Sequence, residues 1–197
     1  MLKIEYVWRE LLYRAIEQRN PYFSIIQLSN LFKLSTSVVS HAILPLKGLG
    51  VVKIAKKRSK IADIERLLLF WATRRNLQKD ILYQTYSSLP LLEKESSMPA
   101  NVFPTAYTAY RFLYDDIPSD YEDSYFYTGD IQPIIKRFPP NSKKSPNIII
   151  LRQDPYLPGY KQTPLAQIFA DLWNLPDWYA KEFSDALLAK IRERVGL

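Results

Sequence analysis

The chain has no cysteine, and this absence removes several classes of chemistry at once. Disulfides, thiolate metal sites and cysteine nucleophiles all need a residue type that the 197-residue sequence does not contain. The single histidine, His41, excludes a multi-histidine metal cluster. With only five glycines, the sequence offers no glycine-rich loop that could cradle a phosphate group. We therefore expect a protein that works without a metal or a cofactor.

Long hydrophobic runs are also missing. The longest apolar stretches, around Leu67–Ala72 and Ile148–Leu151, fall far short of the ~20 residues that a membrane span needs. The N-terminal residues follow an amphipathic helical pattern that contains Glu5 and Glu10, which is unlike a signal peptide. We expect a cytoplasmic protein with no membrane partner. Its 197 residues suit one domain or two small ones, and its 47% apolar composition is enough to form their cores.

Positive charge is present in excess, but only in the first part of the chain. Residues 1–80 carry 15 Lys or Arg against 6 Asp or Glu, whereas residues 81–197 carry 12 against 14. The whole chain has a net charge of +7. This asymmetry points to a polyanion partner for the first part and a different task for the second. Basic proteins are common, so the charge alone does not identify the partner, and the local sequence pattern is needed.

Two helix N-caps organise the basic part. Apolar residues at helical spacing predict a helix over about residues 3–18, which Asn20-Pro21 ends. Ser24 with Gln27 forms a capping box, and Ser35 is the next N-cap. Caps eleven residues apart predict a short helix, a tight turn and another short helix. This spacing is typical of a helix-turn-helix.

The second short helix has a polar face. Its apolar residues would pack inward, while Thr36, Ser37, Ser40 and His41 are left on the solvent side near its start. Residues at the start of a recognition helix contact base edges in DNA. Pro45 is predicted to end this helix or to bend its last turn.

A basic hairpin is predicted to follow. Residues 51–55 read as a strand, Lys56 to Lys60 as a wing tip and 61–62 as a returning strand. An isolated basic triplet is usually a solvated turn, but after a helix-turn-helix it favours contact with DNA phosphates. The predicted DNA contacts are Lys33, Thr36, Ser37, Ser40, His41, Lys47, Lys53, Lys56, Lys57, Arg58 and Lys60.

The remaining sequence mixes helical and strand patterns. Asp63 caps a predicted helix over 64–76, residues 81–86 read as a strand, and 87–99 is a plausible boundary region. Further helices are predicted over 104–114, 131–137, 164–173 and 177–194, and strands over 125–128 and 147–152. The expected fold is α+β, with a winged helix-turn-helix domain (1–80) followed by a small α/β domain (81–197).

An acidic cluster is the best candidate for a catalytic site. It consists of Asp115, Asp116, Asp120, Glu122, Asp123 and Asp130. In a strand, Asp120 and Glu122 would share a face and could clamp a divalent metal. However, neighbouring Pro118 and Gly129 are typical of a solvated loop, and no Gly-Ser turn precedes an Asp-x-Asp pair, as a nucleotidyltransferase would need. We expect no catalytic and no metal-binding residues.

The closing region carries a family resemblance. The stretch Thr163–Leu175, followed by a helix containing Ala186-Leu187-Leu188, resembles the end of AbiE-type (type IV) antitoxin regulators. The Leu28-Ser29 and Val39-Ser40 contexts and the helix carrying Trp71–Arg75 agree with the same architecture. The resemblance spans most of the chain and weakens over 87–160. It implies a winged-helix repressor of a toxin operon, whose α/β domain is similar to an inactive nucleotidyltransferase.

Three hypotheses follow. The leading one is a sequence-specific DNA-binding transcriptional regulator, a repressor of the antitoxin type without enzymatic activity. The second is a nucleotidyltransferase or nuclease whose winged helix delivers DNA, which requires Asp120, Glu122 and Asp130 to converge. The third is a module that grips a toxin, another protein or a second copy of itself, and an exposed aromatic patch within 160–197 would favour it. A palindromic operator would require a homodimer.

Overall fold

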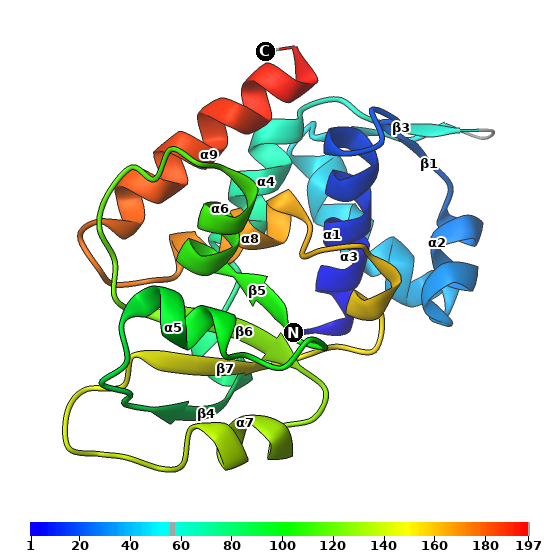
Figure 1. Ribbon diagram of the computed structural model, residues 1–197. Helices are drawn as coiled ribbons and strands as arrows, with labels where there is room; N and C mark the ends of the chain where they lie inside the picture. The colour runs from blue at the N-terminus through cyan, green and yellow to red at the C-terminus, as the bar shows by residue number, and fades with distance from the viewer. Residues whose placement is uncertain (56–57, 197) are drawn as a thin grey trace.

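The computed structural model describes residues 1–55 and 58–196, which form a mixed α+β fold (Figure 1). The described part holds nine α-helices and two small sheets. The first elements are α1 (Lys3–Ile16), β1 (Tyr22–Phe23), α2 (Ile25–Phe32), α3 (Thr36–Gly48), β2 (Val52–Lys53), β3 (Ser59–Ile61) and α4 (Ile64–Ala72). None of the described helices is both long and apolar enough to cross a lipid bilayer.

The second half begins at the short 3-10 helix η1 (Leu77–Asp80). Its further elements are β4 (Ile81–Thr85), α5 (Leu91–Ser96), β5 (Phe103–Thr105), α6 (Ala106–Leu113), β6 (Ser124–Thr128), α7 (Gln132–Arg137), β7 (Ile148–Arg152), the 3-10 helix η2 (Leu157–Gly159), α8 (Leu165–Trp173) and α9 (Ala180–Val195). The predicted strands over 81–86, 125–128 and 147–152 are confirmed, as are the four predicted helices that correspond to α6 to α9.

Side-chain caps set the starts of the short helices, as the sequence predicts. The Oγ atoms of Ser24 and Ser35 each accept a hydrogen bond at 3.3 Å, from the backbone N–H groups of Gln27 and Val38. Asp63 caps α4 in the same way through Arg66 N, at 2.8 Å. Each cap satisfies a backbone donor that has no partner within the helix. The turn between α2 and α3 is therefore fixed by local chemistry.

Pro45 does not end α3, because the helix continues to Gly48. A proline lacks the N–H that would donate to the carbonyl four residues earlier, here that of His41. Both Pro45 and His41 lie on the exposed side of α3. Since water can reach that side, the missing hydrogen bond costs less than it would on the buried side.

The first sheet joins the segment between α1 and α2 to the β2–β3 hairpin. Its strand order is β1-β3-β2 and all pairs are antiparallel. β3 lies in the centre, where Lys60 is opposite Tyr22 on one side and Lys53 on the other. The sequence analysis missed β1, whose two residues are too few to show an alternating pattern. The predicted wing tip at Lys56 and Lys57 lies outside the described residues.

The second sheet has the order β4-β7-β6-β5, with β6 and β7 parallel and the outer pairs antiparallel. In β7, Ile148 and Ile150 pack with Ile134 and Phe138 on the α7 side. The alternate residues Ile149 and Leu151 join the main core on the other side. The sheet is therefore buried on both faces, which explains the continuous apolar sequence of β7.

The N-terminal and C-terminal halves share one main core. A single cluster of buried apolar side chains extends from Val7 in α1 to Ile191 in α9. α1 contacts α3 and α4 of its own half and α8 and α9 of the other (Figure 1). The region 87–99 contains α5, whose Lys94 and Glu95 are buried. The two halves on either side of residue 80 thus do not have separate main cores.

Buried ion pairs reinforce this junction. Arg9, which has no solvent exposure, donates to both carboxylate oxygens of Asp154 at 2.6 and 2.8 Å and to Gln167 at 3.0 Å. Arg75 donates to Asp80 at 2.6 Å and to Asp171 at 3.0 Å. In both cases a guanidinium group of residues 1–80 is neutralised by a carboxylate of residues 81–197.

Asp171 accepts hydrogen bonds from three different residues at this junction. Besides Arg75, it accepts hydrogen bonds from Tyr127 Oη at 2.6 Å and from Thr105 Oγ1 at 2.7 Å. These donors come from the segment between α4 and η1, from β6 and from β5, so one carboxylate on α8 ties the end of the first half to two strands of the second. A buried carboxylate needs this number of donors because it has lost its hydration.

Glu17 is a second buried acid between the halves, but it has no cationic hydrogen-bond partner among the described residues. Its Oε1 accepts from Leu165 N at 2.7 Å, and its Oε2 is buried without a partner. Burial raises the pKa of Glu17 to about 7, although the Leu165 N–H and the charge of Arg194 oppose the rise and Glu10 adds to it. The carboxyl is therefore about half protonated in the folded state near pH 7, where an ordinary glutamate would be ionised.

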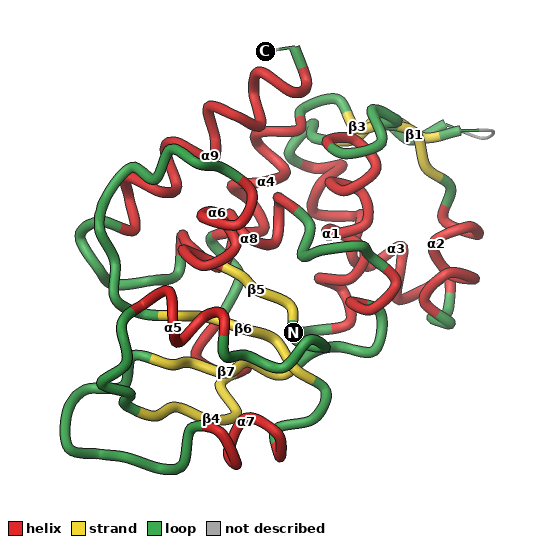
Figure 2. The backbone as a smooth tube through the Cα atoms, in the orientation of Figure 1, coloured by secondary structure: helices red, strands yellow, loops and turns green. Residues whose placement is uncertain are grey.

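The long loop between α6 and β6 arches past α9 (Figure 2). Asp116 in this loop pairs with Lys190 of α9 at 3.1 Å, and the hydrogen bond from Lys190 lowers the pKa of Asp116. Both groups are at the surface, so the pair contributes little to stability. Its role is to orient the loop against the last helix.

Asp154→Ala should lower the free energy of unfolding by about 3–5 kcal/mol, because it leaves the Arg9 guanidinium buried and unpaired. The double variant Arg9→Met with Asp154→Leu should regain part of the loss. Urea unfolding followed by circular dichroism measures both, and Asp120→Ala at an exposed site is the control. A loss below about 1 kcal/mol would contradict the structural role of the pair.

Glu17→Gln should remove a pH dependence of stability. Below about pH 4.5 the acid is neutral in both the folded and the unfolded state, so it has no effect. Between about pH 4.5 and pH 7 the carboxyl ionises more in the unfolded than in the folded state, so the wild type loses stability across this window, and above about pH 7 the loss levels off. The variant should therefore be more stable than the wild type at pH 8, by about 3 kcal/mol, and this gap should shrink toward pH 5. Parallel pH profiles for the wild type, Glu17→Gln and the exposed control Glu182→Gln would contradict this.

Candidate nucleic-acid interface

α3 presents a polar face to solvent. Thr36, Ser37, Ser40, His41 and Lys47 are all exposed, as the sequence analysis expects. The opposite side of the helix is buried through Val39, Ala42, Ile43 and Leu46. No Asp or Glu occurs anywhere in α3, so nothing on this face repels an anion.

α1 holds α3 in place from behind. Trp8 Nε1 donates a hydrogen bond at 2.9 Å to the backbone carbonyl of Ala42, and both residues are buried. Ser29 Oγ donates a hydrogen bond at 2.5 Å to Leu34 O, which closes the turn between α2 and α3. Lys33, the first predicted contact, sits in this turn with a left-handed backbone (φ 49°) and an exposed side chain. The orientation of the polar face is thus set by the core.

The exposed side of the first sheet carries a row of cations. Lys53 and Lys60 are direct cross-strand neighbours, and Tyr22 is the neighbour of Lys60 on its other side. Arg58 lies over the Tyr22 ring with 4.4 Å from Cζ to the ring centroid, and Lys60 Nζ lies at 5.8 Å. Like charges directly opposite each other destabilise a sheet. Arg58 and Lys60 thus gather at the Tyr22 ring, and Lys53 adds a third cation on the other side of Lys60, at a cost to the stability of the sheet.

These cations have no carboxylate partner among the described residues. Lys33, Lys47, Lys53, Arg58 and Lys60 form no ion pair within residues 1–55 and 58–196. In the same half, the described ion pairs of the guanidinium groups belong to Arg9, Arg14, Arg66 and Arg75. Lys3, Arg19, Arg74 and Lys79 also lack an ion pair among the described residues, so the five predicted contacts are distinguished by their place on the α2–α3 turn, α3 and the β2–β3 hairpin.

Nine of the eleven predicted DNA contacts are described, and all nine are exposed. The fold groups Lys53, Arg58 and Lys60 on the hairpin and the polar residues together on α3. Lys56 and Lys57 lie outside the described residues. The sequence analysis missed Tyr22, because its place beside Lys60 depends on a strand pairing that no local pattern announces. Figure 1 shows the first sheet and α2 at the edge of the molecule away from α5 and β4.

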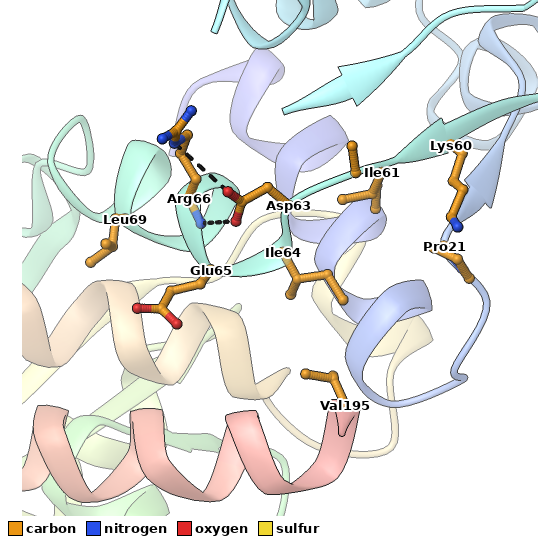
Figure 3. A pocket seen from close by; sticks show the side chains of 10 residues that line it. Pro21, Lys60, Ile61, Asp63, Ile64, Glu65, Arg66, Leu69 and Val195 are labelled. Atoms are coloured by element: carbon orange, nitrogen blue, oxygen red, sulfur yellow. Dashed lines mark hydrogen bonds and ion pairs between the residues drawn. The ribbon is translucent and has the colours of Figure 1, made fainter. Parts of the chain in front are cut away.

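A cavity of about 730 Å³ lies at the base of the hairpin (Figure 3). Lys60 and Ile61 of β3, the start of α4 and Val195 at the end of α9 line it. Arg66 turns back to Asp63, its helix cap, and Glu65 pairs with Arg192 of α9 at 2.5 Å. Asp63 and Glu65 are thus already paired, whereas Lys60 at the rim has no ion-pair partner among the described residues.

The acidic cluster does not converge. Asp120 and Glu122 lie in the loop before β6 and Asp130 lies beyond its other end, and all three side chains are exposed. The five-residue strand between them spans roughly 16 Å. Asp123 is half-buried, and burial followed by the charge of Asp177 raises its pKa to about 6. The described residues contain no group of three or more His, Asp or Glu side chains placed to share a metal ion.

Comparison with known proteins adds nothing to this geometry, since no family model, no curated protein and no solved structure matches the chain.

Ser35→Ala should lower the free energy of unfolding by about 1 kcal/mol, because the Val38 N–H loses its partner. Ser35→Asp should retain the wild-type value, since a carboxylate caps equally well. Urea unfolding monitored by far-ultraviolet circular dichroism gives the values. Ser40→Ala, within the same helix, is the control and should cause no loss. Equal effects of Ser35→Ala and Ser40→Ala would contradict the capping role.

Proposed function

We propose that the chain is a DNA-binding transcriptional regulator that recognises specific sequences in double-stranded DNA through a winged helix-turn-helix formed by α1 to β3. α3 is the recognition helix and the β2–β3 hairpin is the wing. The observation that carries the proposal is the set of unpaired cations on the hairpin and the turn beside the polar, acid-free face of α3. The protein acts by binding and carries out no reaction.

The two surfaces have separate tasks in this proposal. The major groove of B-DNA is about 12 Å wide and admits one α-helix, so α3 reads base edges. Its hydroxyl groups and the imidazole of His41 donate or accept single hydrogen bonds, which gives modest discrimination per base. Lys53, Arg58 and Lys60 on the hairpin contact phosphates and supply affinity that is independent of sequence. Phosphate contacts by the hairpin also fix the register of α3.

The repressor role and the antitoxin assignment rest on the resemblance of Thr163–Leu175 and the Trp71–Arg75 helix to AbiE-type regulators. The same resemblance suggests that residues 81–197 are an inactive nucleotidyltransferase-like domain. The separation of Asp120 and Glu122 from Asp130 agrees with the lack of activity, because a metal-dependent transfer needs convergent carboxylates.

A protein-binding role for the second half is a compatible second candidate. Trp173 is 47% exposed and Trp178 is 74% exposed, and both lie within the closing region that contains α8 and α9. Exposed tryptophans are enriched at protein interfaces. This surface would suit a toxin or a second copy of the chain, and a homodimer would match a palindromic operator.

Arg58→Ala with Lys60→Ala should weaken binding to a random-sequence duplex and reduce its salt dependence. Each lost phosphate contact lowers the slope of log K against log salt by about 0.9, so the double variant should lose about 1.8. Fluorescence anisotropy at several salt concentrations measures the slope. The matched control is Lys136→Ala with Lys143→Ala, which removes two exposed lysines of the second half and should leave the slope unchanged. Wild-type affinity and slope in the hairpin variant would refute the proposed DNA contact.

A further inference from the structure

Leu44 occupies an unexpected place on α3. It is 66% exposed and lies seven residues after Ser37 and three after His41, which puts it on the same outward face of the helix. The buried side of α3 is elsewhere, at Val39, Ala42, Ile43 and Leu46. A large aliphatic side chain is therefore exposed on a face whose other predicted contacts, Ser37, Ser40, His41 and Lys47 among them, are polar.

The surroundings of Leu44 leave this side chain accessible. Gly48, one turn further on the same face, has open space where a Cβ atom would lie. Pro45 beside it is exposed and has no polar side-chain group. Burying a leucine is favourable, so the exposure of Leu44 forgoes a stabilisation that the four buried residues of α3 obtain. A partner that covers Leu44 would recover it.

We infer that Leu44 contacts the C5-methyl group of a thymine and thereby selects thymine at one position of the bound DNA. This inference rests on the proposed function, because it requires α3 to lie in the major groove. The thymine methyl is the one apolar group that base pairs present there. Serine, threonine and histidine supply polar contacts, and Leu44 is the sole large aliphatic side chain on the described outward face between Ser37 and Lys47.

Leu44 also discriminates against the other bases. Cytosine has only a hydrogen at C5 and presents an amino donor where thymine has O4, while guanine and adenine present polar groups in the major groove. Leucine can pair with none of these, so each would lose its water without gaining a hydrogen bond. The contact thus favours thymine by attraction and disfavours the alternatives by desolvation.

The test compares thymine with deoxyuridine, which lacks only the methyl group. The full-length protein is used to select preferred duplexes from a random pool, and each thymine of the selected site is then replaced singly by deoxyuridine. For the wild type, one replacement should weaken binding about three- to fivefold, the effect of one buried methyl group. Leu44→Ala should bind the thymine duplex more weakly and should no longer distinguish it from the deoxyuridine duplex.

The control variant is Leu92→Ala, which truncates a leucine of similar exposure (60%) on α5. It should keep the wild-type preference for thymine. Because Leu44 is exposed, thermal unfolding of Leu44→Ala should match the wild type, which separates a binding defect from a folding defect. A loss of the thymine preference in Leu44→Ala alone, with unchanged unfolding, supports the inference.

Two kinds of failure are distinguishable. If no duplex is selected and random DNA is not bound, the proposed function fails and the inference fails with it. If DNA is selected but no deoxyuridine replacement weakens binding, or if Leu44→Ala keeps the preference, only the inference is overturned. Sedimentation gives the oligomeric state of Leu44→Ala. A changed oligomeric state with an unaltered DNA preference would assign Leu44 to a protein contact and would also overturn the inference.

Discussion

The pairing of buried guanidinium groups with carboxylates from the other half of the chain is the constraint on which the structure depends. Arg9 needs Asp154 and Arg75 needs Asp171, because an unpaired charge in the core is costly. These pairs fix α1 and α4 against α8 and the second sheet. Since α3 is anchored to α1 through Trp8, the direction of its polar face is fixed by the same pairs.

The buried cations and the cations of the proposed DNA-binding surface differ in their partners. Guanidinium groups in the interior are matched by carboxylates and hold the halves together, whereas the cations of the hairpin and the α2–α3 turn have no ion-pair partner among the described residues. Lys53 and Lys60 face each other across the sheet at a cost in stability. A net charge alone would not reveal this, since the paired and unpaired groups contribute to it equally.

Local signals predicted the local features. The caps at Ser24, Ser35 and Asp63 depend on residues three positions apart, so they could be read from the sequence. The shared core could not, because Arg9 and Arg75 look like surface charges until their partners, about 145 and 96 residues away, are placed. α5 was missed for a similar reason: its buried Lys94 depends on the carbonyl of Glu122 in a distant loop. At the candidate site, the exposure of the polar α3 residues could be predicted from their helical spacing. The position of Tyr22 beside Lys60 could not, because it depends on the pairing of β1 with β3.

The distance in sequence between Arg75 and Asp171 also bears on how the protein is made. During synthesis the first half leaves the ribosome well before its partners, since roughly 90 residues separate Asp80 from Asp171. At ~5–20 residues per second this interval lasts roughly 5–20 s. Throughout it, α1 and α4 have no α8 to cover them, so their apolar sides are open to aggregation or to a chaperone. The nascent chain therefore completes its core only when the last third has been translated.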